Sequence, residues 1–365
     1  MNRFIISGGG TGGHIFPAIA IANQLKKEIP NAKILFIGAT GKMEMNLVPQ
    51  ADYNILGLDI FGIRRDMSWN GIKSNLKLPF VLLKTMHKAK KIMRHFNPDV
   101  VIGVGGYASG PALRAAQALN IPTVIQEQNS YPGKTNKWLS KKVSKICVAY
   151  DGLEVFFPKE KIVKTGNPVR TEIINFTPKS EEAYTFFQLD TNKKTVLIIG
   201  GSQGAHTINQ AVLEHIEDFK KMDCQMIWQT GELFYKTITP QLEELQTENI
   251  KILPFIKSMN LAYSVADYIV SRAGALAIAE LAIVGAPTIL IPLPTAAEDH
   301  QTANAKQLSD AGAAILLPDK EVNEKLYPTL VSLMSDSEKS LKISQKLKPF
   351  AKPNAILEIV KEIIA

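Results

Sequence analysis

Three glycine-rich segments hold the backbone groups best suited to binding phosphate. The first, GGGTGGH at 8–14, places five glycines and Thr11 directly before His14. The others are GVGGYASGP at 103–111 and GGSQGAH at 200–206. Each follows a short apolar run and precedes a stretch with helical spacing. Main-chain N–H groups and the amino end of a helix then meet at one turn, which favours recognition of a phosphate or diphosphate.

Other readings of these segments find less support. The first also fits the G-x-G-x-x-G dinucleotide pattern, which further requires an acidic residue at the end of the second strand. That strand ends LFIGATGK, without an acid, which argues against an NAD-dependent oxidoreductase. No G-K-[S/T] follows any of the three segments, and H-E-x-x-H does not occur. Any single segment could still be a tight turn that binds nothing.

A fourth candidate segment begins at Ser271. There Gly274 precedes a helix expected over Ala275–Val284, whose amino end again suits a diphosphate. Glu280 lies about two turns into that helix, where its carboxylate could accept both hydroxyls of a ribose or simply face solvent. Further on, Gln301 and Asn304 lie one turn apart and could face a sugar or cap a helix.

Short apolar runs alternate with helical stretches along the whole chain, which predicts an α/β fold of parallel sheets covered by helices. Eleven strands are too many for one open sheet, so we expect two doubly wound sheets of five or six strands. The expected strands are 4–7, 34–38, 100–104, 123–126, 146–149, 195–199, 225–229, 252–254, 268–271, 288–291 and 314–316.

The break between the two domains should fall at KTGNPVRTEI, where Gly166, Asn167 and Pro168 interrupt the pattern. We therefore expect an N-terminal domain at 1–167 and a C-terminal domain at 168–349. For the segment 176–192 the sequence predicts neither a helix nor a strand. A last helix at about 350–365 could pack on either domain, with a return to the first preferred. Ligands of such domains bind at the carboxyl ends of the strands. We therefore expect the ligand-binding edges of the two sheets to face each other across a cleft.

Composition limits the class of protein. Of 365 residues, 45% are hydrophobic, which excludes a disordered chain. The two cysteines, Cys147 and Cys224, are expected to be reduced and buried. No run reaches the length of a membrane span, and no secretory signal is evident. The net charge of +8 is uneven, because residues 1–165 carry +13 and the rest −5. An anionic partner of the first half is expected, unless this surface is only solvated.

Taken together, these motifs resemble the MurG family of peptidoglycan N-acetylglucosaminyltransferases. The resemblance runs in order along nearly the whole chain, through GGGTGGHIFPAIAIA, GVGGYASGP, QEQNSYPGKTNK, TGNPVR, GGSQGAHTIN and SRAGALAIAELAIVGAPTILIPLP…EDHQTANA. It implies a GT-B fold of two Rossmann-like domains. It also implies transfer of GlcNAc from UDP-GlcNAc to the C4 hydroxyl of MurNAc-pentapeptide on undecaprenyl diphosphate (lipid I), which forms lipid II. The configuration inverts, and no metal or cofactor is needed.

The resemblance also implies the site residues. In it, Ile256 reads the uracil edge through its backbone and Glu280 holds the ribose. Arg170 and Ser202 face the diphosphate, and Gln301 faces the GlcNAc hydroxyls. The full set of nucleotide-sugar contacts is Thr11, Gly12, Gly13, Asn129, Arg170, Ser202, Ile256, Ala275, Leu276, Ala277, Ile278, Ala279, Glu280 and Gln301. The resemblance also implies that the acceptor diphosphate is bound by the glycine segments of the first domain, including Gly105, Gly106, Tyr107 and Ser109.

Inversion in one step needs a base at the acceptor hydroxyl. His14 suits this role because its side chain titrates near neutrality, although it could instead contact the acceptor or be structural. Glu127 is the competing base; its alternative role is a buried carboxylate that orients Asn129. Three residues depart from the family pattern. Gln126 stands where His is usual, Ala277 where Thr is common, and His300 replaces one Gln of a pair.

A basic and apolar stretch suits an anionic membrane. Residues 62–96 carry nine Lys and Arg and one acid, interleaved with Trp69, Ile72, Phe80 and Leu83, and KTNKWLSKK places Trp138 among four lysines. Charge alone would suit RNA equally, but a lipid-linked acceptor favours the membrane, so no nucleic acid partner is expected. We expect a peripheral protein on the cytoplasmic face of the plasma membrane, near cell-wall and division machinery. The alternatives are a glycolipid synthase, a UDP-GlcNAc epimerase or an inactive UDP-sugar-binding protein.

Overall fold

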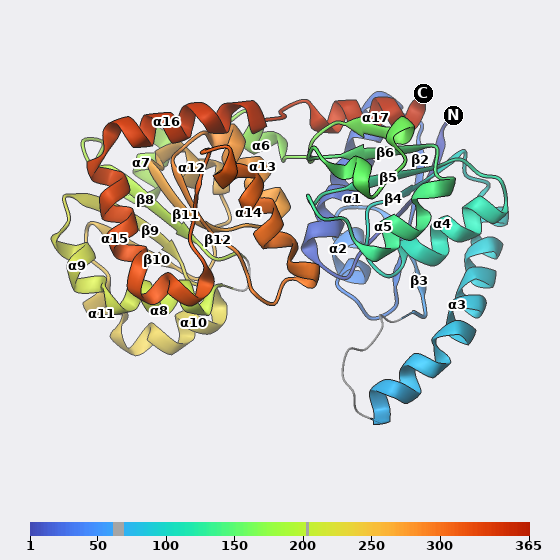
Figure 1. Ribbon diagram of the computed structural model, residues 1–365, viewed down its shortest axis with the longest axis horizontal. Helices are drawn as coiled ribbons and strands as arrows, with labels where there is room; N and C mark the ends of the chain where they lie inside the picture. Colours follow the sequence, from blue (N-terminus) through green and yellow to red (C-terminus); the bar gives the residue numbers. More distant parts are fainter. Residues whose placement is uncertain (61–68, 202–203) are drawn as a thin grey trace. The chain divides into compact units, whose positions relative to one another are not determined.

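The chain divides into two compact units, each with its own parallel sheet and core (Figure 1). The computed structural model describes residues 1–60, 69–201 and 204–365. Unit 1 comprises Met1–Pro168 and Asn354–Ala365, and unit 2 comprises Val169–Pro353. The sequence boundary after residue 167 and the structural one after residue 168 differ by one position.

Unit 1 is built on a seven-stranded parallel sheet with the order β3-β2-β1-β4-β5-β6-β7. The strand order reverses between β1 and β4, so the connections that follow these two neighbouring strands run in opposite directions across the sheet. The strands are β1 (Arg3–Ser7), β2 (Lys33–Ala39), β3 (Asn54–Leu58), β4 (Val100–Gly103), β5 (Thr123–Glu127), β6 (Lys145–Val148) and β7 (Ile162–Lys164).

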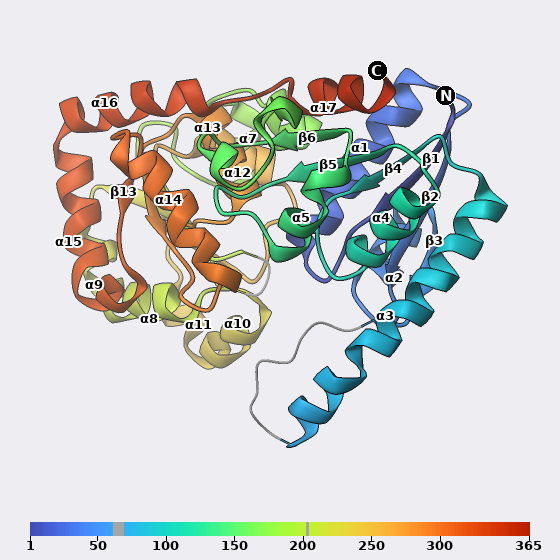
Figure 2. The same ribbon diagram turned by 45° about the vertical axis from the view of Figure 1, so that its right-hand side comes forward.

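Helices cover both faces of this sheet because successive strand residues point to opposite sides. Phe4 and Ile6 pack with α1 (Gly12–Glu28) and α17 (Ala355–Ile364), whereas Ile5 packs on the opposite side with α3 (Trp69–Phe96) and α4 (Ser109–Ala118). Figure 2 shows α3 alongside α4. The remaining helices of the unit are α2 (Glu44–Gln50) and α5 (Lys134–Leu139).

Unit 2 repeats the plan with six parallel strands in the order β10-β9-β8-β11-β12-β13. Its strands are β8 (Lys194–Ile199), β9 (Cys224–Gln229), β10 (Ile250–Leu253), β11 (Tyr268–Arg272), β12 (Thr288–Ile291) and β13 (Ile315–Leu316). Its helices are α6 (Thr171–Ile174), α7 (Glu181–Phe187), α8 (His206–Glu214), α9 (Ile216–Lys221), α10 (Glu232–Ile238), α11 (Leu242–Leu245), α12 (Met259–Val265), α13 (Ala275–Val284), α14 (His300–Asp310), α15 (Val322–Ser335) and α16 (Ser337–Leu347).

The predicted pair of Rossmann-like α/β domains is confirmed, but the first sheet is larger than expected. Strands β3 and β7 were not predicted, because the first four residues of β3 alternate between exposed and half-buried and only Leu58 is buried, while β7 has three residues, none fully buried. Both are edge strands, which lack the continuous apolar run of a central strand. The unassigned segment 176–192 contains helix α7, which begins at a Ser180 cap. Both cysteines are free and buried, as predicted.

Candidate active site

The glycine-rich turns after β1 and β4 pack directly against each other. A Cβ atom added to Gly8 would lie 2.1 Å from Val104 Cγ2. One added to Gly106, whose φ is +86°, would lie 2.2 Å from the Gly9 carbonyl oxygen. Glycine is therefore required at both turns for close backbone approach, whatever they bind.

Glu44 occupies part of the first glycine turn. This carboxylate is 1% exposed, and it accepts hydrogen bonds of 2.9 Å from the main-chain N–H groups of Gly10 and Ala39. A carboxylate of the chain itself thus lies at the end of β2, against the turn that a dinucleotide would use. Glu44 was not among the predicted site residues, because it lies five residues beyond β2 and only the fold brings it back to Gly10.

His14 lies where the turns after β1 and β4 meet the end of β5. It is the third residue of α1 and half-buried. Its Nδ1 atom lies 3.2 Å from Gln128 Oε1. The imidazole rests on Gly105, where an added Cβ would come within 2.6 Å of His14 Cε1. The structure therefore brings together three predicted features: the first glycine segment, the second one, and the QEQN segment.

Glu127, the second candidate base, is fully engaged by its own loop. Its Oε1 accepts from the Asn129 main-chain N–H at 3.0 Å and from Asn129 Nδ2 at 3.3 Å. Its Oε2 accepts from Asn136 Nδ2 at 2.8 Å and from the Gly133 N–H at 3.2 Å. Burial raises the pKa of Glu127, although these hydrogen bonds act in the opposite direction. This geometry favours the orienting role over the base.

The other candidates of unit 1 differ in exposure. Thr11 and Gly13 are exposed at the start of α1, and Asn129 is half-buried. Tyr107 is 50% exposed, whereas Ser109 is buried and donates a hydrogen bond of 2.9 Å to the Gly106 carbonyl. Ser109 thus closes the second glycine turn from inside, and Tyr107 presents its ring to solvent.

In unit 2, Glu280 links Arg170 to Tyr263. Its Oε1 accepts from Arg170 Nε at 3.0 Å, and its Oε2 accepts from the Tyr263 hydroxyl at 3.1 Å. The Glu280 side chain is only 14% exposed, so it is not a solvated helix residue. Tyr263 is buried, and burial raises its pKa well above the usual value. Tyr263 was not among the predicted site residues, because nothing in its local sequence indicates this contact.

Helix α13 begins at Ala275 with features that suit an anion. Gly274 precedes it in an extended conformation and provides no side-chain cap, and the first turn of the helix contains no acidic residue. Ala275, Leu276, Ala277, Ile278 and Ala279 form its first turns, ahead of Glu280. A helix that starts this way offers main-chain N–H groups and a partial positive charge.

Three further candidate residues, Ile256, Gln301 and Asn304, form hydrogen bonds within unit 2. The Ile256 main-chain N–H donates to Gln229 Oε1 at 3.3 Å, and Gln301 Oε1 accepts from the Leu293 N–H at 2.9 Å. Asn304 is fully buried and donates to the Ala273 carbonyl at 3.4 Å. Ser202 lies outside the described residues.

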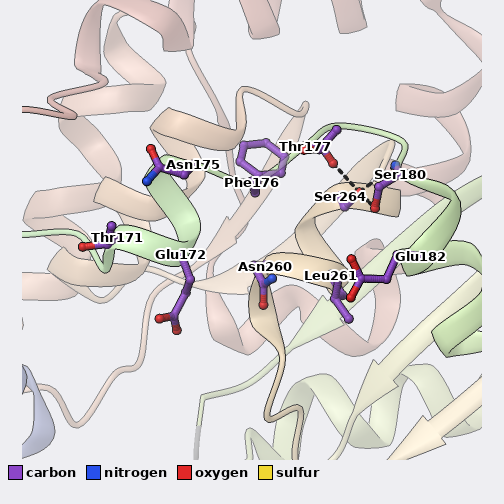
Figure 3. A pocket seen from close by; sticks show the side chains of 10 residues that line it. All are labelled: Thr171, Glu172, Asn175, Phe176, Thr177, Ser180, Glu182, Asn260, Leu261 and Ser264. Atoms are coloured by element: carbon purple, nitrogen blue, oxygen red, sulfur yellow. Dashed lines mark hydrogen bonds between the residues drawn. The ribbon is translucent and has the colours of Figure 1, made fainter.

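A polar cavity of about 480 Å³ lies elsewhere in unit 2, beside α6, α7 and α12 (Figure 3). Its wall includes the carboxylates of Glu172 and Glu182 but no Lys or Arg. At one side of this cavity, Ser264 donates to the Thr177 carbonyl at 2.6 Å and accepts from the Ser180 N–H at 3.0 Å (Figure 3). The acidic wall is unsuited to a diphosphate. Among the described residues, no group of three or more His, Cys, Asp or Glu side chains could hold a metal ion.

Comparison with known proteins assigns the family. Residues 4–148 match the glycosyltransferase family 28 N-terminal domain, and residues 195–359 match the glycosyltransferase family 28 C-terminal domain. The chain belongs to glycosyltransferase family 28. A family 28 relative from Flavobacterium psychrophilum is 51% identical over 99% of this chain and 97% of its own. That relative is named UDP-N-acetylglucosamine--N-acetylmuramyl-(pentapeptide) pyrophosphoryl-undecaprenol N-acetylglucosamine transferase.

Solved structures agree with the family 28 assignment. The crystal structure of Acinetobacter baumannii MurG is 31% identical, with a TM-score of 0.79 over 100% of this chain and 99% of that one. UDP-GlcNAc 2-epimerase from Neisseria meningitidis, bound to UDP-GlcNAc, aligns over the full length of both chains with a TM-score of 0.67. Its identity is 16%, so that likeness concerns the fold alone. The predicted GT-B class and the MurG resemblance are confirmed.

Proposed function

We infer that this protein transfers GlcNAc from UDP-GlcNAc to MurNAc-pentapeptide diphosphoundecaprenol. The observation that carries this inference is the 51% identity, over 99% of the chain, to a relative named for that reaction. In the step we propose, the acceptor C4 hydroxyl oxygen bonds to C1 of GlcNAc while the bond from C1 to the UDP oxygen breaks. The hydroxyl proton passes to a base, and UDP leaves as the anion.

Unit 2 carries the donor in this proposal. The leaving diphosphate gains negative charge, which suits the amino end of α13 and the Arg170 guanidinium. Glu280 would accept the ribose hydroxyls, and the Ile256 backbone would meet the base. In the structure Arg170 and Glu280 bind each other, so donor binding would exchange part of this ion pair for contacts with the nucleotide.

Unit 1 carries the acceptor. His14 is our choice of base, because the Glu127 oxygens are already occupied by four N–H donors. The amino end of α1, with Thr11, Gly12 and Gly13, would face the acceptor diphosphate, because Glu44 already binds Gly10.

Turnover with lipid I, or an analogue with a shortened lipid, and labelled UDP-GlcNAc tests the function. We expect labelled disaccharide lipid and UDP in equal amounts. Arg170→Ala should raise the KM for UDP-GlcNAc, and His14→Ala should lower kcat by about 10²–10⁴-fold. Release of UDP without labelled lipid would contradict the proposal, and a normal rate of His14→Ala would remove His14 as the base.

An epimerase or a glycolipid synthase is the competing function. An epimerase would convert UDP-GlcNAc without any acceptor, and a glycolipid synthase would accept a lipid that lacks MurNAc. The same assay distinguishes them by omitting the acceptor or exchanging it for another lipid.

We also propose that α3 binds an anionic membrane surface, where a lipid-linked acceptor would be located. Phe80 is 77% exposed and Leu83 is 66% exposed, and Lys84, Lys88 and Lys91 continue the same helix face. The opposite face, with Thr85, Ala89 and Met93, is buried, so Phe80 and Leu83 are not core residues. The side chains of the predicted Trp69 and Ile72 lie outside the described residues. Among the described helices, none is long and apolar enough to cross a membrane.

A further inference from the structure

A closed set of three buried amides lies beneath His14. Gln126 is 0% exposed, Gln128 1% and Asn167 3%. They come from β5, from the loop after it and from the TGNP segment, and each bonds to the next. Buried amides orient one another strictly, because each has one end that only donates and one that only accepts.

Main-chain carbonyls fix the direction of the whole set. Asn167 Nδ2 donates to the Gln128 carbonyl oxygen at 2.9 Å, so Asn167 Oδ1 faces the other way and accepts from Gln126 Nε2 at 3.0 Å. Gln126 Oε1 then accepts from Gln128 Nε2, which also donates to the Val104 carbonyl oxygen at 2.9 Å. A reversed Gln128 would place its oxygen against two acceptors, which is unfavourable.

Only one tautomer of neutral His14 agrees with this direction. Gln128 Oε1 lies 3.2 Å from His14 Nδ1, and an amide oxygen can only accept. Nδ1 must then carry the proton. Nε2 is consequently the ring nitrogen with a lone pair, which is the atom a general base uses to take a proton.

We propose that Gln128 is a positioning residue that fixes His14 as the Nδ1–H tautomer, with Gln126 and Asn167 holding Gln128 in the required orientation. This rests on the proposed function for its catalytic consequence, but not for the tautomer itself. The proposal also explains what Gln126 does in this chain. Where the family usually has His, Gln126 supplies an amide that both donates and accepts.

Nitrogen-15 NMR of the full-length protein, labelled at its six histidines, tests the tautomer directly. The His14 signals are assigned by their loss in His14→Gln, at a pH where the imidazole is neutral. We expect the wild type to carry the proton on Nδ1. In Gln128→Met, which keeps the side-chain length but removes the acceptor, the proton should move partly or wholly to Nε2. A wild-type proton on Nε2, or an unchanged tautomer in Gln128→Met, would overturn the proposal.

Steady-state kinetics test the positioning role. Gln128→Met should lower kcat by about 10- to 100-fold, within the contribution of a general base, while the KM for UDP-GlcNAc changes less than about twofold. Gln225→Met removes a buried amide of unit 2 and should leave kcat near the wild-type value. A shifted tautomer with normal kcat would overturn the positioning role. If the wild type transfers no GlcNAc, the proposed function fails, and the NMR result still decides the tautomer.

Gln126→Leu provides a second variant in case Gln128→Met does not fold. It removes one acceptor of Gln128 Nε2 but leaves the Val104 carbonyl in place. We expect a smaller tautomer shift and a smaller loss of kcat than in Gln128→Met. An effect on kcat with no tautomer shift would contradict the proposed order of contacts.

Discussion

Three carboxylates, those of Glu44, Glu127 and Glu280, accept hydrogen bonds from different parts of the structure. Glu44 binds the first glycine turn, Glu127 holds its own loop, and Glu280 pairs with Arg170 and Tyr263. All three accept N–H or O–H groups, but only the contact between Glu127 and Asn129 was among the alternatives that the sequence offered. Their mutation should therefore affect different properties.

Tyr263→Phe should weaken donor binding without changing the chemical step. The variant removes one hydroxyl that donates to Glu280, and a hydrogen bond of this kind contributes about 0.5–1.5 kcal/mol. We expect the KM for UDP-GlcNAc to rise about 2- to 10-fold at nearly constant kcat, measured by initial rates. Tyr235→Phe in the same unit is the control. An unchanged KM would show that Tyr263 does not support the donor site.

Glu127→Gln should destabilise the loop that carries Asn129. One oxygen becomes an NH₂ group that faces N–H donors of Gly133 and Asn136 or of Asn129. Unsatisfied buried donors cost about 1–3 kcal/mol, which should appear in denaturant unfolding. If Glu127 were instead the base, the same variant would lose kcat by about 10²-fold or more at nearly wild-type stability.

Cys147 gives a pH-dependent contribution to stability. Burial raises the pKa of its thiol from 9.0 to about 12. The folded state therefore holds the proton more tightly than the unfolded state. This contribution is complete below pH 9 and is lost as the pH rises toward 12. The difference in unfolding free energy between the wild type and Cys147→Ala should narrow as the pH rises from about 9 toward 12. A constant difference would be inconsistent with the buried thiol.

At the scale of elements, the neighbouring turns after β1 and β4 form a scaffold for one side chain. Gly8 and Gly106 leave no room for Cβ atoms between the turns, Gly9 leaves room for the Glu44 carboxylate, and Gly105 leaves room for the His14 ring. The glycines thus set the position of His14, the candidate base. Gly105 also has a φ of +94°, which L side chains rarely adopt.

The exposed face of α3 should determine membrane binding. A double variant, Phe80→Ser with Leu83→Ser, removes apolar area that a membrane would bury. Burying such a side chain contributes about 1.5–3 kcal/mol, so binding to anionic vesicles should fall by at least about tenfold. Sedimentation with vesicles measures this, and high salt should release the wild type because its lysines act through charge.

The control for α3 removes as many exposed apolar side chains elsewhere. Phe186 and Leu341 in unit 2 are each 58% exposed, and their double serine variant should sediment like the wild type. Equal losses in both variants would show that binding is unrelated to α3.

At the scale of the molecule, the sequence predicted what periodicity and glycine placement determine. Ala275–Val284 is a helix with the predicted bounds, the last helix, Ala355–Ile364, lies within the predicted 350–365, and the central strands lie where the apolar runs are. The sequence did not predict β3 and β7, because strands at the edges of a sheet bury few side chains. It also did not predict the contacts of Glu44, Gln128 and Tyr263. Those contacts join residues 17–114 positions apart, and only the folded chain brings such residues together.

The last helix completes the core of unit 1. Ile359, Val360 and Ile363 of α17 are buried in the same cluster as Phe4 and Ile6. Ile359→Ala should cost about 2–5 kcal/mol of unfolding free energy, because it removes a fully buried side chain. Leu357→Ala, at a position 37% exposed on the same helix, should cost less than about 1 kcal/mol. Equal costs would mean that α17 does not seal this core.

The return of residues 354–365 to unit 1 has a consequence during translation. A nascent chain that has just emerged to residue 353 holds all of unit 2, yet its earlier half still exposes the apolar surface that α17 will cover. The part of the protein made first is therefore finished last. We therefore expect the ribosome-bound chain to expose this apolar surface until residues 354–365 emerge and α17 packs on it.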